Sequence, residues 1–125
     1  MATILLVDDD DQVRMMLSEV IAKEGHTMVE AADGNQAVRL YDPDTIDLVI
    51  TDIVMPEKEG LETIREIRAV NPDVRIIAIS GGGRIKPEDY LDWANRIGVD
   101  RTFAKPVRRV DLLKAVNDLL GVEVA

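Results

Sequence analysis

Residues 47–56 have the sequence DLVITDIVMP, and the rest of the fold can be inferred outward from them. Residues 48–50 form a short apolar run that is typical of a strand buried on both faces of a sheet. Asp52 follows at the carboxyl end of this strand, and Pro56 prevents the strand from continuing. Taken alone, Asp52 could simply begin a turn. Parallel α/β sheets, however, bind their ligands at the carboxyl ends of their strands, which makes Asp52 a candidate for a functional site.

The composition is that of an ordinary globular protein. The 125 residues suit one domain, 46% of them are hydrophobic, 31% are charged, and no cysteine is present for a disulfide or a thiolate metal site. The net charge of −9 disfavours a nucleic-acid surface and favours a cation or a basic partner. The N-terminus lacks the basic start of a signal peptide, and no apolar run is long enough to span a bilayer. A cytoplasmic protein is expected.

Apolar segments with the character of buried strands alternate along the chain with segments of helical periodicity. The strands are expected at residues 4–7, 26–31, 48–50, 74–80 and 102–104, and the helices around residues 13–21, 37–41, 61–68, 91–97 and 110–120. This alternation, with short loops, predicts an α/β fold: a doubly wound parallel sheet of five strands with five helices on its two faces. Nothing is left over for a second domain, so residues 1–125 are expected to form a single domain.

Polar side chains follow four of the expected strands at their carboxyl ends. They are Asp8 and Asp9, Asp52, Ser80, and Lys105. In a parallel sheet these ends lie at one edge, so the side chains are expected to converge there. Three crowded carboxylates repel one another and call for a cation, and Mg2+ is the ion that prefers such oxygen ligands. Asp10 or Asp11, which come next, can instead cap the first helix.

These side chains are suited to a reaction in which one carboxylate accepts and carries a phosphoryl group. Asp52 stands alone at its strand end and is the better candidate for the nucleophile, while Asp8 and Asp9 form a metal-binding pair. The metal ion and Lys105 would neutralise the charge on the phosphoryl oxygens, and Ser80 would supply a hydroxyl donor.

With these residues in place, the chain resembles the receiver domains of two-component response regulators, and in particular the stand-alone chemotaxis regulators. The matching residues are Val7-Asp8-Asp9, Asp52 with Met55-Pro56 and Gly60, Ser80-Gly81, and Lys105-Pro106. Each motif is weak alone, whereas the set in this order is specific. The resemblance covers essentially the whole chain. It implies a flavodoxin-like sheet of strand order 2-1-3-4-5, a signalling module rather than an enzyme, and no output domain.

The resemblance implies a role for each matching residue. Asp52 would accept a phosphoryl group from the phosphohistidine of a sensor histidine kinase or a phosphotransfer protein. Besides Asp52, the Mg2+ ligands would be Asp9, the backbone carbonyl of Val54, and Asp8 through a water molecule. Ser80 and Lys105 would contact the phosphoryl group, and the Lys105–Pro106 peptide bond is commonly cis in this family.

The sequence departs from the family pattern in two respects. Thr102 stands where the family usually carries an aromatic switch residue, and the neighbouring Phe103 is expected to point the other way, into the core. Val54 and Gly82 stand where the family often has polar side chains that position water for dephosphorylation. We therefore expect a long-lived phosphoryl-aspartate, and we expect signalling to work through Ser80 and the loop of residues 81–84.

The expected partners are proteins, with no direct contact to nucleic acid or membranes. A downstream protein would bind the fourth helix, the last strand and the fifth helix, and the chain would be a monomer or a phosphorylation-dependent dimer. Three other residues are given structural roles. His26, the only histidine, is expected at the surface, and Met15 and Met16 are expected in the core and at its rim.

Two other functions are compatible with parts of the sequence. An aspartyl-phosphate phosphohydrolase of the haloacid-dehalogenase kind could use Asp8 and Asp10 with Ser80 and Lys105. That family, however, expects a further acidic pair after the lysine, and here the acidic residues lie within a helical pattern. An FMN-binding flavodoxin would need a phosphate-binding loop after the first strand, which is missing, and only 3% of the residues are aromatic.

Overall fold

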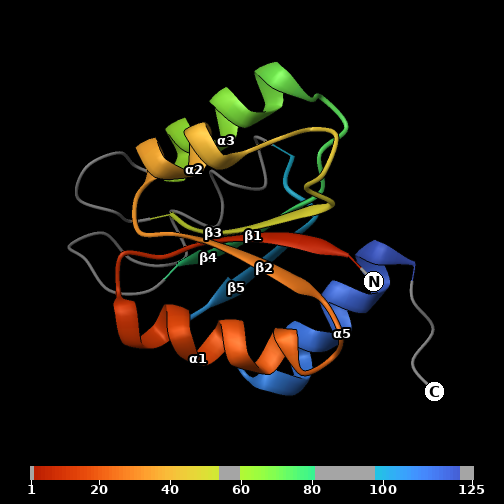
Figure 1. Cartoon of the computed structure of the whole chain (residues 1–125). Helices are drawn as coiled ribbons and strands as arrows, with labels where there is room; N and C mark the ends of the chain where they lie inside the picture. The colour runs from red at the N-terminus through yellow and green to blue at the C-terminus, as the bar shows by residue number, and fades with distance from the viewer. Residues whose placement is uncertain (1, 54–59, 81–97, 122–125) are drawn as a thin grey trace.

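The computed structural model describes residues 2–53, 60–80 and 98–121. Five parallel strands form one sheet in the order β2-β1-β3-β4-β5 (Figure 1). The strands are β1 (Thr3–Val7), β2 (Thr27–Ala31), β3 (Leu48–Asp52), β4 (Ile76–Ser80) and β5 (Arg101–Ala104). The predicted α/β class and strand order are therefore confirmed.

Helices cover both faces of this sheet, which makes it doubly wound. The helices within the described ranges are α1 (Asp11–Ala22), α2 (Gly34–Leu40), α3 (Gly60–Val70) and α5 (Arg109–Leu120). Figure 1 shows α2 and α3 on one face and α1 and α5 on the other. The helix expected around residues 91–97 lies outside the described residues. No helix in the described parts of the chain is long and apolar enough to cross a membrane.

Alternate residues of the central strands enter two separate cores. In β1, Ile4 and Leu6 belong to the core shared with α1 and α5, whereas Leu5 and Val7 belong to the core shared with α2 and α3. Every residue of β3 and β4 is buried. Successive side chains of a strand point to opposite faces, so a continuous apolar run is needed to fill both cores. This explains why the central strands lack a polar alternation.

The helix α1 begins at one of its two predicted capping residues, and α5 ends at a glycine. The carboxylate of Asp10 accepts hydrogen bonds from the backbone N–H groups of Gln12 and Val13, at 3.0 and 3.2 Å. Asp10 thus caps α1 and satisfies donors that the helix leaves unpaired. At the other end of the chain, Gly121 ends α5 in the left-handed conformation, with φ at 69°.

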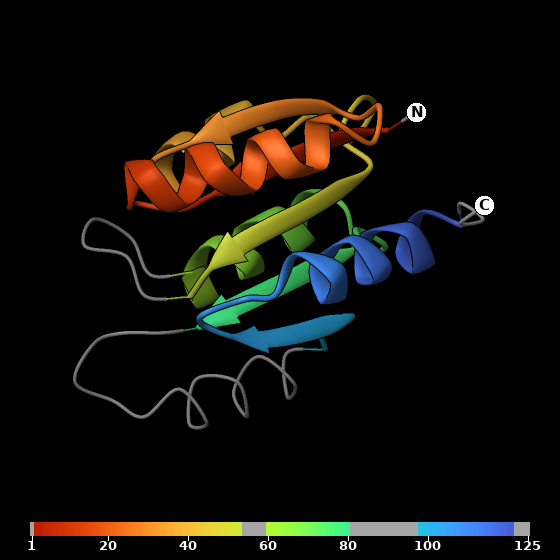
Figure 2. The same cartoon turned by 90° about the horizontal axis from the view of Figure 1, so that it is seen from below.

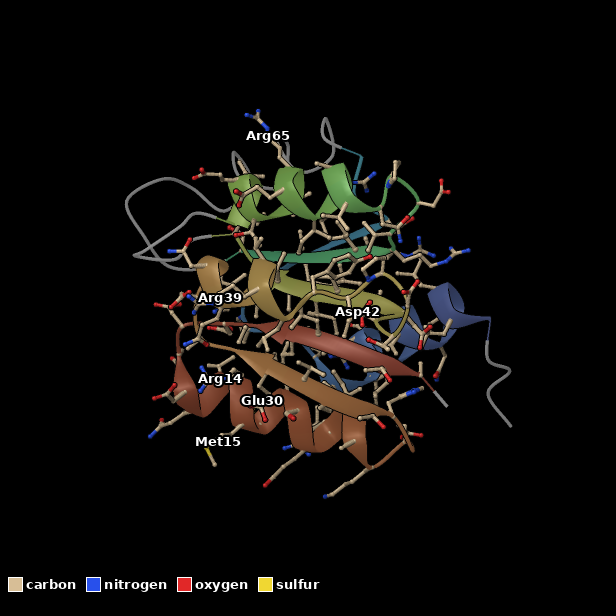
Figure 3. All side chains as sticks on the ribbon, turned by 45° about the horizontal axis from the view of Figure 1, so that its top comes forward. Arg14, Met15, Glu30, Arg39, Asp42 and Arg65 are labelled. Atoms are coloured by element: carbon tan, nitrogen blue, oxygen red, sulfur yellow. The ribbon has the colours of Figure 1, made fainter. Side chains whose placement is uncertain are left out.

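The prediction for Met15 and Met16 was wrong. They are 58% and 43% exposed, and Figure 3 shows Met15 pointing away from the sheet. The face that α1 buries is formed instead by Leu17, Ser18 and Ile21. Met16 and Leu17 are adjacent apolar residues separated by about 100° around the helix, so only one of them can lie at the centre of the buried stripe.

His26 was also predicted incorrectly. Its exposed fraction is 9%, and its Nδ1 accepts a hydrogen bond from the backbone N–H of Ala2 at 3.3 Å. The imidazole thus joins the start of the chain to the entry of β2. Because a phosphohistidine carrier needs an accessible imidazole, this burial argues against such a role for His26.

Gly60 allows α3 to begin directly against the end of β3. Its backbone N–H donates to the carbonyl of Ile53 at 2.7 Å. A Cβ at this position would overlap the carbonyl oxygen of Asp52 and would lie 2.5 Å from the Cα of Ile53. A close approach between backbone segments is therefore the reason for a glycine here.

The substitution Gly60→Ala is expected to lower the free energy of unfolding by about 1–3 kcal/mol, because the added methyl group meets backbone atoms that cannot rotate away. Urea unfolding followed by circular dichroism measures the change. Glu62→Ala is the control, since Glu62 is exposed in the first turn of the same helix. Equal stability of Gly60→Ala and the wild type would contradict the close-approach explanation.

Candidate functional site

Four strands of the sheet end at the same edge, and their ends carry the side chains of the candidate site. Asp8 directly follows β1, Asp52 and Ser80 are the last residues of β3 and β4, and Lys105 directly follows β5. Figure 2 shows the arrowheads of β2, β3, β4 and β5 at one side of the molecule. The backbone N–H of Lys105 donates to the Ser80 carbonyl at 2.8 Å, which fastens the ends of β4 and β5 together.

Lys105 bridges two buried carboxylates. Its Nζ donates to Asp52 Oδ2 at 2.8 Å and forms an ion pair with Asp8 Oδ2 at 3.2 Å. The side chains of both aspartates are 3% exposed, and that of Lys105 is 23% exposed. Charges this far from water interact more strongly than charges on an open surface. The three side chains therefore form one electrostatic unit.

The charge state of Lys105 follows from its surroundings. Burial lowers the pKa of Lys105, but the hydrogen bond to Asp52 and the negative charges of Asp52 and Asp8 outweigh this effect, so the pKa is raised above 10.5. Because the pKa of Lys105 is higher in the folded state than in the unfolded state, the ion pairs of Lys105 stabilise the fold fully at pH values below the unfolded-state pKa. This stabilisation is lost only as the pH rises through the folded-state pKa. At neutral pH the lysine is a fixed cation.

Asp9 adds an exposed third carboxylate to this pair. One carboxylate oxygen from each of Asp8, Asp9 and Asp52 can be chosen so that all three lie within 4.8 Å of one another. Mg2+ binds oxygen at about 2.1 Å, so two of its ligands lie at most about 4.2 Å apart. The cluster therefore fits Mg2+ with a small side-chain movement or with water between ion and carboxylate. Val54, whose carbonyl is another expected ligand, lies outside the described residues.

Ser80 provides a buried hydroxyl at the end of β4. Its side chain is fully buried, and Oγ has no hydrogen-bond partner among the described residues. A buried hydroxyl without a partner is unfavourable. Ser80 therefore has a donor available for an acceptor that arrives from outside this part of the chain, such as a phosphoryl oxygen.

The end of β5 combines an expected feature with a departure from the family pattern. Phe103 packs against the core shared with α1 and α5, as its place in the strand predicts. Thr102, Phe103 and Lys114 are among the residues that line an open hollow of about 420 Å3 between β5 and α5. The Lys105–Pro106 peptide bond is cis, as the resemblance implies.

The chain is similar to known proteins along most of its length. Residues 4–117 match the response regulator receiver domain family. The sensor kinase CckA of Brucella abortus is 40% identical in an alignment of 124 residues that covers 95% of this chain and 12% of that protein. The chemotaxis protein CheY of Bacillus subtilis is 36% identical over 119 residues, covering 94% of this chain and 97% of that protein. The crystal structure of TrrA from Thermotoga maritima superimposes with a TM-score of 0.83 at 32% identity, covering 96% of this chain and 100% of that one.

The chain belongs to the response regulator receiver domain family of two-component signalling, whose members accept a phosphoryl group. The haloacid-dehalogenase alternative finds no support in these matches. Because the chain spans only 12% of the sensor kinase, the other activities of that protein do not carry over.

The substitution Lys105→Met tests the electrostatic unit. Removing the ammonium leaves Asp8 and Asp52 buried without their shared cation, and the free energy of unfolding in EDTA is expected to fall by about 1–3 kcal/mol. Mg2+ should then stabilise the variant more than it stabilises the wild type, because the ion replaces part of the lost charge. Urea unfolding with and without Mg2+ measures both effects.

Lys114→Met is the matched control, since Lys114 is an exposed lysine on α5. It should change stability by no more than about 0.5 kcal/mol. If the two lysine variants lost the same stability in EDTA, the bridge at Lys105 would not be the interaction that holds the two carboxylates.

Proposed function

We propose that this protein is a receiver whose phosphoryl acceptor is Asp52 and whose cation is Mg2+. The observation that carries the proposal is the 2.8 Å hydrogen bond from Lys105 Nζ to Asp52 Oδ2, with the carboxylates of Asp8 and Asp9 beside it. A single carboxylate held against a fixed cation, at the mouth of a parallel sheet, suits nucleophilic attack on phosphorus. The TrrA structure is a complex with Mg(2+)-BeF, which supports a Mg2+ requirement here too.

In the proposed reaction, a carboxylate oxygen of Asp52 forms a bond to phosphorus while the bond from phosphorus to the donor nitrogen breaks. Lys105 redirects a hydrogen bond from the carboxylate to a phosphoryl oxygen, and the Ser80 hydroxyl donates to another. Asp8 and Asp9, with Asp52, would hold Mg2+, which when bound neutralises charge on the phosphoryl oxygens. Most of the rate enhancement then comes from position and charge.

The partners follow from this chemistry. The donor is proposed to be a phosphohistidine of a sensor histidine kinase or a phosphotransfer protein in the cytoplasm. The similarity to the receiver-containing sensor kinase CckA supports a donor of this kind. A downstream protein is proposed to bind β5 and α5, together with the segment where the fourth helix is expected. The described part of that surface surrounds the hollow at Thr102 and carries the charged side chains of Arg101, Asp111 and Lys114.

Incubation with Mg2+ and acetyl phosphate, followed by intact-mass measurement, tests the acceptor. The wild type is expected to gain one phosphoryl group, and Asp52→Asn is expected to gain none, because an amide is not a nucleophile toward phosphorus. Both proteins should have the same circular dichroism spectrum. An adduct on Asp52→Asn would move the nucleophile to Asp8 or Asp9, and the absence of an adduct on a wild type that binds Mg2+ would contradict the proposal.

The lifetime of the phosphoryl-aspartate is a second test. Val54 has an apolar side chain and Gly82 has none, so neither can position an attacking water molecule, and a slow loss of the phosphoryl group is expected. Val54→Asn should shorten the half-life several-fold, whereas Val54→Ala should not. Loss of the adduct within seconds in Mg2+, without a phosphatase, would contradict this expectation. The decay is followed by mass spectrometry after removal of acetyl phosphate.

A further inference from the structure

Arg14 has contacts to the candidate metal site that sequence reasoning did not assign. It lies on α1, just after the acidic loop, and Figure 3 shows it beside Glu30 of β2. Its side chain is 15% exposed and donates to three groups. Nη1 donates to the backbone carbonyl of Asp8 at 2.7 Å, Nη2 to Asp11 Oδ1 at 2.6 Å, and Nε to Glu30 Oε1 at 3.3 Å.

The three contacts differ in what they can do. The pair with Asp11 is close to the surface, since that carboxylate is 76% exposed, and such pairs contribute little to stability. The hydrogen bond to the Asp8 carbonyl instead holds the peptide unit that joins Asp8 to Asp9. These two residues carry two of the three carboxylates of the site. Arg14 thus acts on the metal-binding loop through its backbone.

The rest of the loop is already constrained on its other sides. The backbone N–H of Asp8 donates to the Ala31 carbonyl at 3.1 Å, and Asp8 Oδ1 accepts from the backbone N–H of Asp10 at 2.9 Å. Asp8 Oδ2 faces Lys105. These contacts involve the N–H and the carboxylate of Asp8, whereas its carbonyl oxygen accepts from Arg14. The orientation of the following residue, Asp9, depends on this peptide unit, because Asp9 is itself exposed.

Arg14 is in turn oriented by the edge strand of the sheet. Glu30 accepts from Arg14 through Oε1 and from the hydroxyl of Ser18 through Oε2, at 3.3 and 3.4 Å. Partial burial lowers the pKa of Arg14, but the hydrogen bond to Asp11 and the charges of Asp11 and Glu30 outweigh it and raise the pKa. The planar guanidinium offers five donors in a fixed arrangement, so it can serve three acceptors at once, which a lysine ammonium at this position cannot do in the same way.

We propose that Arg14 is a positioning residue for the Mg2+ site: through the Asp8 carbonyl it holds the Asp8–Asp9 peptide so that both carboxylates face Asp52. The inference rests on the proposed function, because it takes Mg2+ as the ion that the site binds. None of the three Arg14 contacts is to a carboxylate of the cluster formed by Asp8, Asp9 and Asp52. Groups that orient metal ligands in this way are commonly needed for full metal affinity.

Charge and geometry make opposite predictions for the loss of Arg14. Removing a positive charge near three carboxylates, and leaving Asp11 and Glu30 unpaired, makes the local potential more negative and should tighten Mg2+ binding. Losing the hydrogen bond to the Asp8 carbonyl releases the loop and should weaken Mg2+ binding. The sign of the change in Mg2+ affinity therefore separates the two effects.

Isothermal titration calorimetry with MgCl2 on the unphosphorylated protein shows whether a substitution tightens or weakens Mg2+ binding. Arg14→Gln and Arg14→Lys are both expected to weaken Mg2+ binding about tenfold. Arg39→Gln, an exposed arginine on α2, is the control and should stay within about twofold of the wild type, since screening limits the effect of a single surface charge. Unchanged or tighter binding by Arg14→Gln, or wild-type affinity in Arg14→Lys, would overturn the inference.

Glu30→Gln separates positioning from a general loss of stability. The amide oxygen can still accept from Arg14, but without a charge it holds the guanidinium less firmly, so Mg2+ binding should weaken less than in Arg14→Gln. When Arg14→Gln and Glu30→Gln are combined, their effects on Mg2+ affinity should be less than additive, because both substitutions act on the same loop. Additive effects on Mg2+ affinity would contradict a positioning role for Arg14. The same holds if the loss of Mg2+ affinity in each variant only followed its loss of stability, measured as the unfolding midpoint in EDTA.

The Mg2+ dependence of phosphorylation measures the effect of Arg14 independently of the titration. In Arg14→Gln the Mg2+ concentration for half-maximal phosphorylation by acetyl phosphate should rise about tenfold, in line with the titration, while the rate at saturating Mg2+ stays within about twofold of the wild type. A lower maximal rate with an unchanged Mg2+ dependence would overturn the inference. A wild type that binds Mg2+ but is not phosphorylated would contradict the proposed function alone, because the titration does not depend on phosphorylation.

Discussion

The site depends on the bridge that Lys105 forms between the buried carboxylates of Asp8 and Asp52. Without it, the negative charges of these two buried carboxylates would repel each other. One ammonium group cannot balance them together with Asp9, so the cluster keeps an excess of negative charge that suits a divalent cation. The same ammonium lies within hydrogen-bond distance of the proposed acceptor carboxylate. One side chain thus serves both the stability of the cluster and the proposed chemistry.

The sheet makes this crowding of charges tolerable. Asp8, Asp52 and Lys105 come from separate strand ends, and the central strands behind them are buried on both faces. Apolar burial on this scale stabilises the domain by far more than a few unfavourable charge contacts can cost. Gly60 contributes by letting α3 begin against the backbone of the Asp52 strand end. The local conformation of Asp52 is therefore held by the core as well as by its ion pair.

The features that depend on short-range sequence patterns could be predicted from the sequence. Apolar runs located the strands, and a parallel sheet then required the polar residues at their ends to converge. Features that depend on neighbours distant in sequence were missed. The phase of α1 could not be chosen between Met16 and Leu17, since both are apolar. His26 is buried and accepts a hydrogen bond from Ala2, which lies 24 residues away in the sequence. Arg14 resembles a solvated arginine until its bond to the Asp8 carbonyl is seen.

The most direct test of the central claim is a Mg2+ titration followed by amide NMR shifts of the unphosphorylated protein. A single binding event is expected, with the largest shifts at residues 8–10, at Asp52 and Ile53, and at Lys105. Calcium chloride at the same ionic strength controls for general screening, and should bind more weakly to a compact site with few ligands. Small shifts spread over the acidic surface, with none concentrated at Asp52 and Lys105, would contradict the claim that these strand ends form one cation site.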